Sequence, residues 1–156
     1  MIVSFLDDKP VGVTLEPPKN PHITIKKKFK LVDLNEEDLI KKLSAEESIK
    51  GVKHLKLGGR KEHGDENNEV IEVLNPEVWQ ELHERIRQVL DSYIVSRDPH
   101  FENNNYLPHV TWKMNGTVNL DPKPYINKTF DVTTLYLIER VHPTESIAKI
   151  LAKIKL

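Results

Sequence analysis

Polar and apolar residues alternate in two short stretches of the chain whose sequences are nearly the same. They read PHITIK at 21–26 and PHVTWK at 108–113, so four of the six positions are identical and the other two are apolar in both. A period of two is typical of a β-strand with one buried face. On each strand the His, Thr and Lys side chains therefore share one face. We expect the apolar faces to pack on a core and the polar faces to line a cleft.

Apolar residues recur at helical spacing in two other segments. The first follows Asn35, a favourable N-cap, opens with acidic residues at 36–38 and is expected to end near 48–51. The second is predicted to be capped by Asn75, with Pro76 at its first helical position. Its apolar stripe, which we expect to face the core, consists of Trp79, Leu82, Ile86, Val89, Leu90 and Tyr93.

Between the two helices, the sequence predicts a β-hairpin. Residues 52–57 alternate apolar and basic side chains, and 70–74 form a second short apolar run. The expected turn is long and polar and lies around 63–68. Gly58 and Gly59 are expected to break the first strand, because glycine weakens a strand interior.

After the second helix, a polar connection at 96–107 leads into the second hexapeptide. A loop at 115–129 then precedes 130–141, which is rich in β-branched and aromatic residues and is predicted to be a strand. The C-terminal segment 147–156 fits both a helix and a strand, and its periodicity alone favours a helix. Since strands and helices do not alternate regularly, the expected fold class is α+β.

The charge balance limits the partners that the chain can have. Its 156 residues can bury a sizeable core, and 23 Lys and Arg stand against 24 Asp and Glu, for a net charge of −1. This argues against a protein that coats long nucleic acid, because such binding neutralises many phosphates. A small phosphorylated ligand needs only local cations, and Lys26, Lys27, Lys28 and Lys30 follow the first hexapeptide. For Lys27 and Lys30 we favour a solvated strand end.

The sequence contains no cysteine, no apolar run long enough to span a membrane and no recognisable signal peptide. We therefore expect a cytoplasmic protein without disulfides or membrane partners, and a monomer.

The two hexapeptides supply the chemistry that a phosphate ester requires. Histidine has an ordinary pKa of about 6.5 and serves as base or acid near neutral pH. Two imidazoles on opposite sides of a phosphodiester can deprotonate the attacking oxygen and protonate the departing one, and hydroxyls can stabilise the charge that builds on the phosphate oxygens. This scheme needs no metal and no cofactor. The other histidines (His54, His63, His83, His100 and His142) show no metal-ligand spacing.

Paired His-x-Thr motifs flanked by apolar residues, one in each half of the chain, resemble the 2H phosphoesterase superfamily. The resemblance implies a single two-lobed domain over 1–156, with antiparallel sheets related by a pseudo-twofold around a central cleft and helices on the outside. Its members tend to end in a strand, so 147–156 is predicted to be one. It also implies a metal-independent phosphodiesterase acting on a 2',3'-cyclic phosphate, a 2'-5' linkage or a cyclic nucleotide, in some relatives with reverse RNA ligase activity.

The resemblance assigns the catalytic roles to four residues, namely His22, Thr24, His109 and Thr111. Either histidine could be the base. Four further residues are candidates for substrate binding: Lys26, Lys113, Tyr106 and Arg140. Tyr106 could stack on a base or pack in the core. Many bacterial relatives carry an Arg shortly after the second motif, where this chain has Lys113-Met114-Asn115. The expected partner is a small nucleotide or an RNA end. The alternative function is a non-catalytic module that binds such a ligand in the same cleft.

Overall fold

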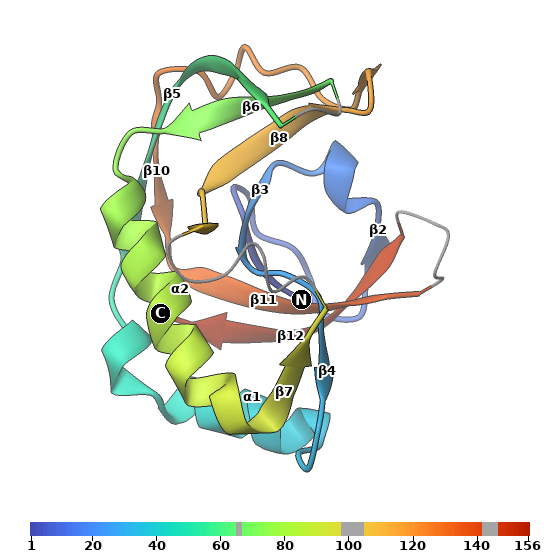
Figure 1. The fold of residues 1–156 in the computed structure, drawn as a ribbon, viewed down its shortest axis with the longest axis vertical. Helices are drawn as coiled ribbons and strands as arrows, with labels where there is room; N and C mark the ends of the chain where they lie inside the picture. The colour runs from blue at the N-terminus through green and yellow to red at the C-terminus, as the bar shows by residue number, and fades with distance from the viewer. Residues whose placement is uncertain (65–66, 98–104, 142–146) are drawn as a thin grey trace.

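The computed structural model describes residues 1–64, 67–97, 105–141 and 147–156, and within them it has one large β-sheet, one small one and two α-helices (Figure 1). All pairings between the described strands are antiparallel. The strand order of the large sheet is β10-β5-β6-β8-β3-β1-β11-β12-β2, with β9 beside β8. The expected α+β fold class is confirmed.

The large sheet has two halves that meet at the repeated hexapeptides. One half consists of β10 (Thr129–Val132), β5 (Lys53–His63), β6 (Asn68–Val73), β8 (His109–Met114) and the short β9 (Thr117–Val118). The other consists of β3 (His22–Lys26), β1 (Ile2–Phe5), β11 (Thr134–Arg140), β12 (Ala148–Lys155) and β2 (Thr14–Leu15). The halves join where β3 runs antiparallel to β8, with Ile23 opposite Val110. The repeat therefore occupies the centre of the sheet.

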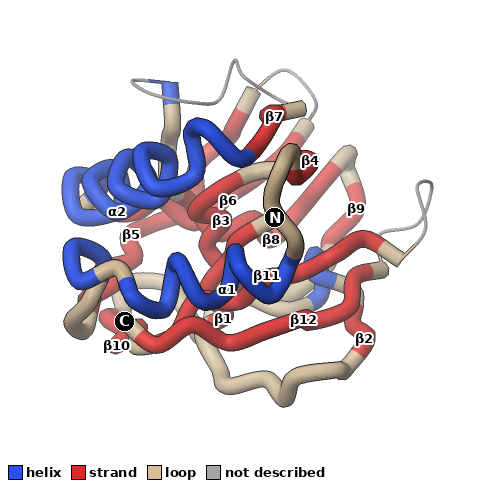
Figure 2. Tube along the Cα trace, turned by 90° about the horizontal axis from the view of Figure 1, so that it is seen from below, coloured by secondary structure: helices blue, strands red, loops and turns tan. Residues whose placement is uncertain are grey.

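The helices α1 (Glu36–Ala45) and α2 (Pro76–Leu90) lie next to each other at one side of the molecule (Figure 2). Helix α1 packs on β12, and α2 packs on β3. Their buried side chains join a core cluster that includes residues from both halves of the sheet, such as Ile23, Leu55, Val110 and Leu135. A second cluster around Val3, Phe5 and Tyr136 covers the other face of β1 and β11, so β1 is buried on both faces.

Short elements complete the fold. The strands β4 (Phe29–Leu31) and β7 (Ile94–Ser96) form the small sheet. Strand β7 begins before the expected polar connection, and part of that connection (98–104) lies outside the described residues. The described residues also include the 3-10 turns η1 (Pro17–Lys19), η2 (Glu47–Ile49) and η3 (Asp91–Tyr93).

Of the two predicted N-caps, Asn35 is confirmed and Asn75 is not. The Asn35 side chain accepts a hydrogen bond from the Asp38 amide at 2.9 Å, which confirms the cap of α1. Helix α1 ends earlier than expected because Glu46 adopts an extended conformation and begins the turn η2. Asn75 precedes α2 but does not cap it. Its side chain instead bridges β5, accepting from the Lys56 amide at 3.0 Å and donating to the His54 carbonyl at 2.7 Å.

The predicted break at Gly58 and Gly59 is wrong, because β5 continues through both residues to His63. The pairing with β6 shifts between Leu57 and Arg60, so a β-bulge absorbs the glycines without ending the strand. A Cβ atom on Gly58 would lie 2.7 Å from Cδ2 of Leu74, so the close approach of the backbone explains this glycine. The turn is consequently shorter than expected.

The segment predicted as one strand over 130–141 is two strands, β10 and β11, that separate at Thr133. Strand β10 pairs with β5 in one half, and β11 pairs with β1 and β12 in the other. The β-strand propensity of the sequence is high throughout 130–141, so it gave no sign that the chain passes from one half of the sheet to the other at Thr133. The predicted C-terminal strand is confirmed as β12, which alternates buried and more exposed residues beside β11.

Candidate active site

The two motif strands place each histidine beside the threonine of the other copy. Because Ile23 lies opposite Val110 in an antiparallel pair, the neighbouring positions set Thr24 next to His109 and His22 next to Thr111. The apolar residues between them, Ile23, Ile25 and Val110, are fully buried. The polar residues therefore share the opposite face, as the alternation predicts.

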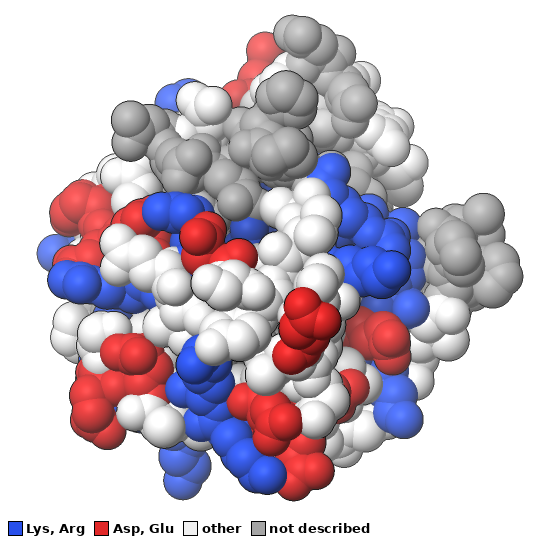
Figure 3. Space-filling view, turned by 60° about the horizontal axis from the view of Figure 1, so that its bottom comes forward, with Lys and Arg blue, Asp and Glu red and all other residues white. Residues whose placement is uncertain are grey.

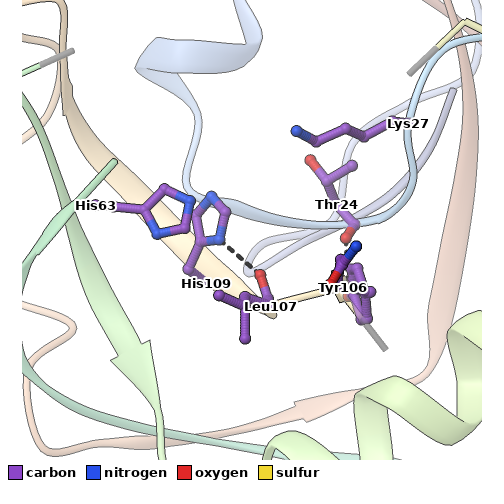
Figure 4. A pocket seen from close by; sticks show the side chains of 7 residues that line it. Thr24, Lys27, His63, Tyr106, Leu107 and His109 are labelled. Carbon is purple, nitrogen blue, oxygen red and sulfur yellow. Dashed lines mark hydrogen bonds between the residues drawn. The ribbon is translucent and has the colours of Figure 1, made fainter. Parts of the chain in front are cut away.

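A pocket of about 90 Å³ opens on this face (Figure 4). It is lined by Thr24, Lys27, His63, Asn105, Tyr106, Leu107 and His109. Three of the predicted site residues, Thr24, Tyr106 and His109, are thus brought together. His22 and Thr111 lie on the same face of neighbouring strands but do not line this pocket.

Each motif histidine makes the same kind of hydrogen bond, to the backbone carbonyl two residues before it. Nδ1 of His109 lies 2.8 Å from the Leu107 carbonyl, and Nδ1 of His22 lies 2.8 Å from the Asn20 carbonyl. Since a carbonyl can only accept, each Nδ1 carries the proton and donates it. In the neutral ring Nε2 then keeps its lone pair, as a general base requires.

The surroundings of both rings disfavour the protonated form. Burial lowers the pKa of His109 to about 4, and the nearby His63, Lys27 and His22 act in the same direction against the smaller opposing effect of the Leu107 carbonyl. Burial also lowers the pKa of His22, against hydrogen bonding to the backbone at Asn20 and Pro17. His22 packs beside Phe5, with ring centroids 5.7 Å apart. Both rings are therefore neutral at neutral pH.

Lys26 does not share the pocket face, although the hexapeptide alternation places it there. Its side chain is only 1% exposed, and Nζ lies 3.4 Å from Oγ of Ser96. The cause is an irregularity in the pairing of β3 with β1: Val3 is opposite Thr24, whereas Ile2 is opposite Lys26. The extra residue changes the phase of the alternation, and Lys27 then faces the pocket. Lys27 was expected to be a solvated strand end; it directly follows β3, is partly exposed and also lines the pocket.

Tyr106 both packs in the core and lines the pocket. Its ring stacks on His83 of α2, with centroids 4.3 Å apart and an angle of 9° between the planes. Its hydroxyl donates to the Thr24 carbonyl at 2.9 Å. Burial raises the pKa of this hydroxyl above its ordinary value. One face of the ring is thus occupied, and Tyr106 fixes the backbone of the motif strand beside the pocket.

The other two candidates for substrate binding lie away from the pocket. Lys113 forms an ion pair with Glu69 of β6 at 2.7 Å. Arg140 lines a separate cavity of about 610 Å³ together with Lys28, Arg97 and four further residues, Met1, Phe29, Glu139 and Val141. Figure 3, with the bottom of the molecule turned forward, shows Lys and Arg gathered in one patch on the right and both charge signs interspersed elsewhere.

Sequence reasoning did not assign four of the pocket residues to the site: Lys27, His63, Asn105 and Leu107. His63 was expected in a polar turn, but it is the last residue of β5. Gly64 and Asn67, which adopt positive φ of 68° and 53°, were the available signal for a shorter turn after His63. The β3 irregularity that turns Lys27 inward has no such signal in the sequence.

The remaining histidines are apart from this site. His54 is exposed and pairs with a carboxylate of β10 at 2.7 Å. His83 is buried, and its Nδ1 lies 2.7 Å from the Ile25 carbonyl. His100 and His142 lie outside the described residues. Among the described residues, no group of three or more His, Asp or Glu side chains is placed to hold a metal ion. Neither described helix combines the length and apolar character that crossing a membrane requires.

No family model matches the chain, and no curated protein sequence matches it. Among solved structures, a crystal structure of a phosphoesterase is similar to it, with a TM-score of 0.58 and 18% sequence identity. The similarity covers 87% of this chain and 76% of that one. The chain therefore has the fold of that phosphoesterase. At this identity the likeness concerns the fold, and the activity has to be argued from the pocket.

Proposed function

We propose that this protein is a metal-independent phosphodiesterase of the 2H type. The observation that carries the proposal is the convergence of Thr24 and His109, from different copies of the hexapeptide, on one pocket that also holds Lys27 and His63. The groups that influence the pKa of His109 through charge are all basic side chains. Such a pocket suits an anion, and a phosphate ester is the anion for which a base and hydroxyl donors are useful.

In the proposed reaction, Nε2 of His109 accepts the proton of the attacking oxygen, which belongs to water or to a ribose hydroxyl. The new phosphorus–oxygen bond forms as the bond to the leaving ribose oxygen breaks, and that oxygen takes a proton from the second imidazole, His22. A pKa of about 4 keeps His109 in the base form at neutral pH. Thr24 and Thr111 donate to the non-bridging oxygens as negative charge builds on them. His22 must take up its proton when the anionic substrate binds.

The substrate class is a 2',3'-cyclic phosphate, a 2'-5' linked nucleotide or a cyclic nucleotide, and the reverse reaction would join RNA ends. The cavity is small, so the phosphate would occupy it while the sugar and base lie at the rim. Leu107, whose side chain is 60% exposed, provides an apolar surface at that rim. A nucleobase can pack against such a surface.

The direct test is a panel of 2',3'-cyclic mononucleotides, 2'-5' dinucleotides and cyclic dinucleotides incubated with the protein in EDTA, with product analysis. The expected result is cleavage of at least one class, with His109→Ala as an inactive control. A strict requirement for a divalent cation would overturn the two-histidine scheme. Binding of these nucleotides without turnover would instead identify the chain as a binding module with the same cleft.

A further inference from the structure

His63 lies against His109 inside the same pocket. The centroids of the two rings are 4.3 Å apart, and their planes are inclined by 39°. Figure 4 shows the two imidazoles side by side, with Lys27 and Thr24 at another side of the pocket. Both histidines are among the residues that line the cavity. A group bound next to Nε2 of His109 would therefore also be close to His63.

The contact is a consequence of tertiary structure. His63 pairs with Asn68, at the end of the β5–β6 hairpin, and the neighbouring Glu69 pairs with Lys113 of β8. In a flat sheet His63 would thus lie level with the far end of β8 rather than with His109 at its start. The two pairing irregularities, one in β5 and one between Glu69 and Val70, increase twist and bending. We attribute the ring contact to this coiling of the hairpin over the sheet.

The charged groups that face the two rings are almost all basic. His109 faces His63 of β5, His22 of β3 and Lys27. Lys27 also acts on His63, together with Lys61. The carboxylate across the strand pair, that of Glu72, accepts a hydrogen bond from the Gly59 amide at 3.4 Å. Two touching imidazoles beside an ammonium group cannot both be protonated without a cost, because like charges repel at this range.

We propose that His63 is a positioning residue of the site, a role that rests on the proposed function: its ring holds the His109 imidazole towards the pocket and keeps Nε2 free of a proton. A bound phosphate changes the balance at His63. Its negative charge compensates the repulsion, and His63 can then take up a proton while His109 stays in the base form. Phosphate binding is consequently coupled to proton uptake.

The test is an NMR titration of the His109 imidazole in the free protein, using ¹³C-labelled histidine, for the wild type and for His63→Gln and His63→Phe. Glutamine removes both the ring and the charge, whereas phenylalanine keeps a ring of similar shape without the charge. We expect the midpoint of His109 to lie near 4 in the wild type and to rise by about half a unit or more in both variants. The matched control is His54→Gln, on the same strand but exposed and paired with Asp131; it should leave the midpoint unchanged.

A second readout uses inorganic phosphate as the probe. In the wild type, calorimetry in buffers of different ionisation enthalpy should detect proton uptake on binding, and His63→Gln should reduce it. With a cleavable substrate, the acid limb of the kcat/KM profile should move to higher pH in both variants, with a smaller loss of kcat in His63→Phe than in His63→Gln. A contribution of His63 to folding alone, without an effect on the His109 ring, would leave the midpoint of His109 where it is in the wild type.

The titration distinguishes a failure of the role proposed for His63 from a failure of the proposed phosphodiesterase function. An unchanged His109 midpoint in His63→Gln overturns the role of His63, whether or not the protein cleaves phosphodiesters. Absence of turnover in the wild type, together with a shifted midpoint, contradicts the proposed function but leaves the electrostatic coupling established. A midpoint shifted in His63→Gln but not in His63→Phe would assign the effect to packing and refute the part played by charge.

Discussion

Thr24 and His109 lie side by side across two antiparallel strands, although each belongs to a different copy of the same hexapeptide. This cross-pairing means that neither copy makes a complete site. The Tyr106 hydroxyl fixes the backbone at Thr24 from the segment that leads into β8, so the two copies are also tied to each other next to the pocket. A single catalytic unit should therefore depend on both strands at once.

Replacing His109 by Gln should reduce kcat/KM by about a hundredfold or more, because the proposed general base is lost. Steady-state kinetics on the best substrate of the panel measures this. The control is His54→Gln, which removes an exposed imidazole from β5. Near-normal turnover in His109→Gln, with the fold intact by circular dichroism, would remove His109 from the mechanism.

Thr24→Val keeps the shape of the side chain and removes its hydroxyl. Loss of one donor to the developing negative charge is expected to lower kcat by about a hundredfold while KM changes little. Thr117→Val on the exposed strand β9 is the matched control. Combining Thr24→Val with His109→Gln should cost less than the product of the two single effects, since the residues act on the same phosphate. Full additivity would argue against a shared site.

Lys27→Met should weaken the binding of inorganic phosphate and raise KM about tenfold, because it removes a positive charge from the pocket wall. Lys30→Met, a few residues on and exposed, should change neither. Calorimetry and steady-state kinetics test both. Equal effects of the two substitutions would point to a general charge effect instead of a contact inside the pocket.

The stability of the protein should fall as the pH is lowered from about 6.5 towards 4. The ordinary pKa of histidine is 6.5 and that of His109 in the fold is about 4, so in this range the unfolded chain binds a proton that the folded chain does not. His22 and His63, whose pKa values are also lowered, act in the same direction. Urea unfolding at a series of pH values measures the slope. His109→Gln should have a shallower slope; the same slope as the wild type would show that His109 titrates normally.

Gly58→Ala should destabilise the protein by about 1 kcal/mol, because the added Cβ would meet Cδ2 of Leu74 at 2.7 Å and Cγ of Glu72 at 2.8 Å, and these side chains must move aside. Gly59→Ala is the neighbouring control, since its nearest contact is an ordinary 3.9 Å to Glu72. Because the bulge at Gly58 helps to aim the hairpin at the pocket, Gly58→Ala should also disturb the His109 resonance. Equal unfolding free energies for both variants would mean that the strand relaxes without cost.

The sequence by itself determined the repeated strands, the polar face shared by His and Thr, and both helices. These follow from side-chain periodicity, which is a property of a few consecutive residues. It also predicted that Trp79 and Trp112 belong to the core, where both are buried. The C-terminal strand needed the family resemblance, because its periodicity alone favours a helix.

Only the tertiary structure decided which side chains meet in the pocket. An irregularity between β1 and β3 buries Lys26 and turns Lys27 inward. The coiled hairpin brings His63 onto His109, and the change of sheet half at Thr133 divides one apolar run into two strands. Each of these depends on pairing register and packing between residues far apart in the chain. A one-residue shift in register reverses the face that a side chain occupies, and no local pattern records that shift.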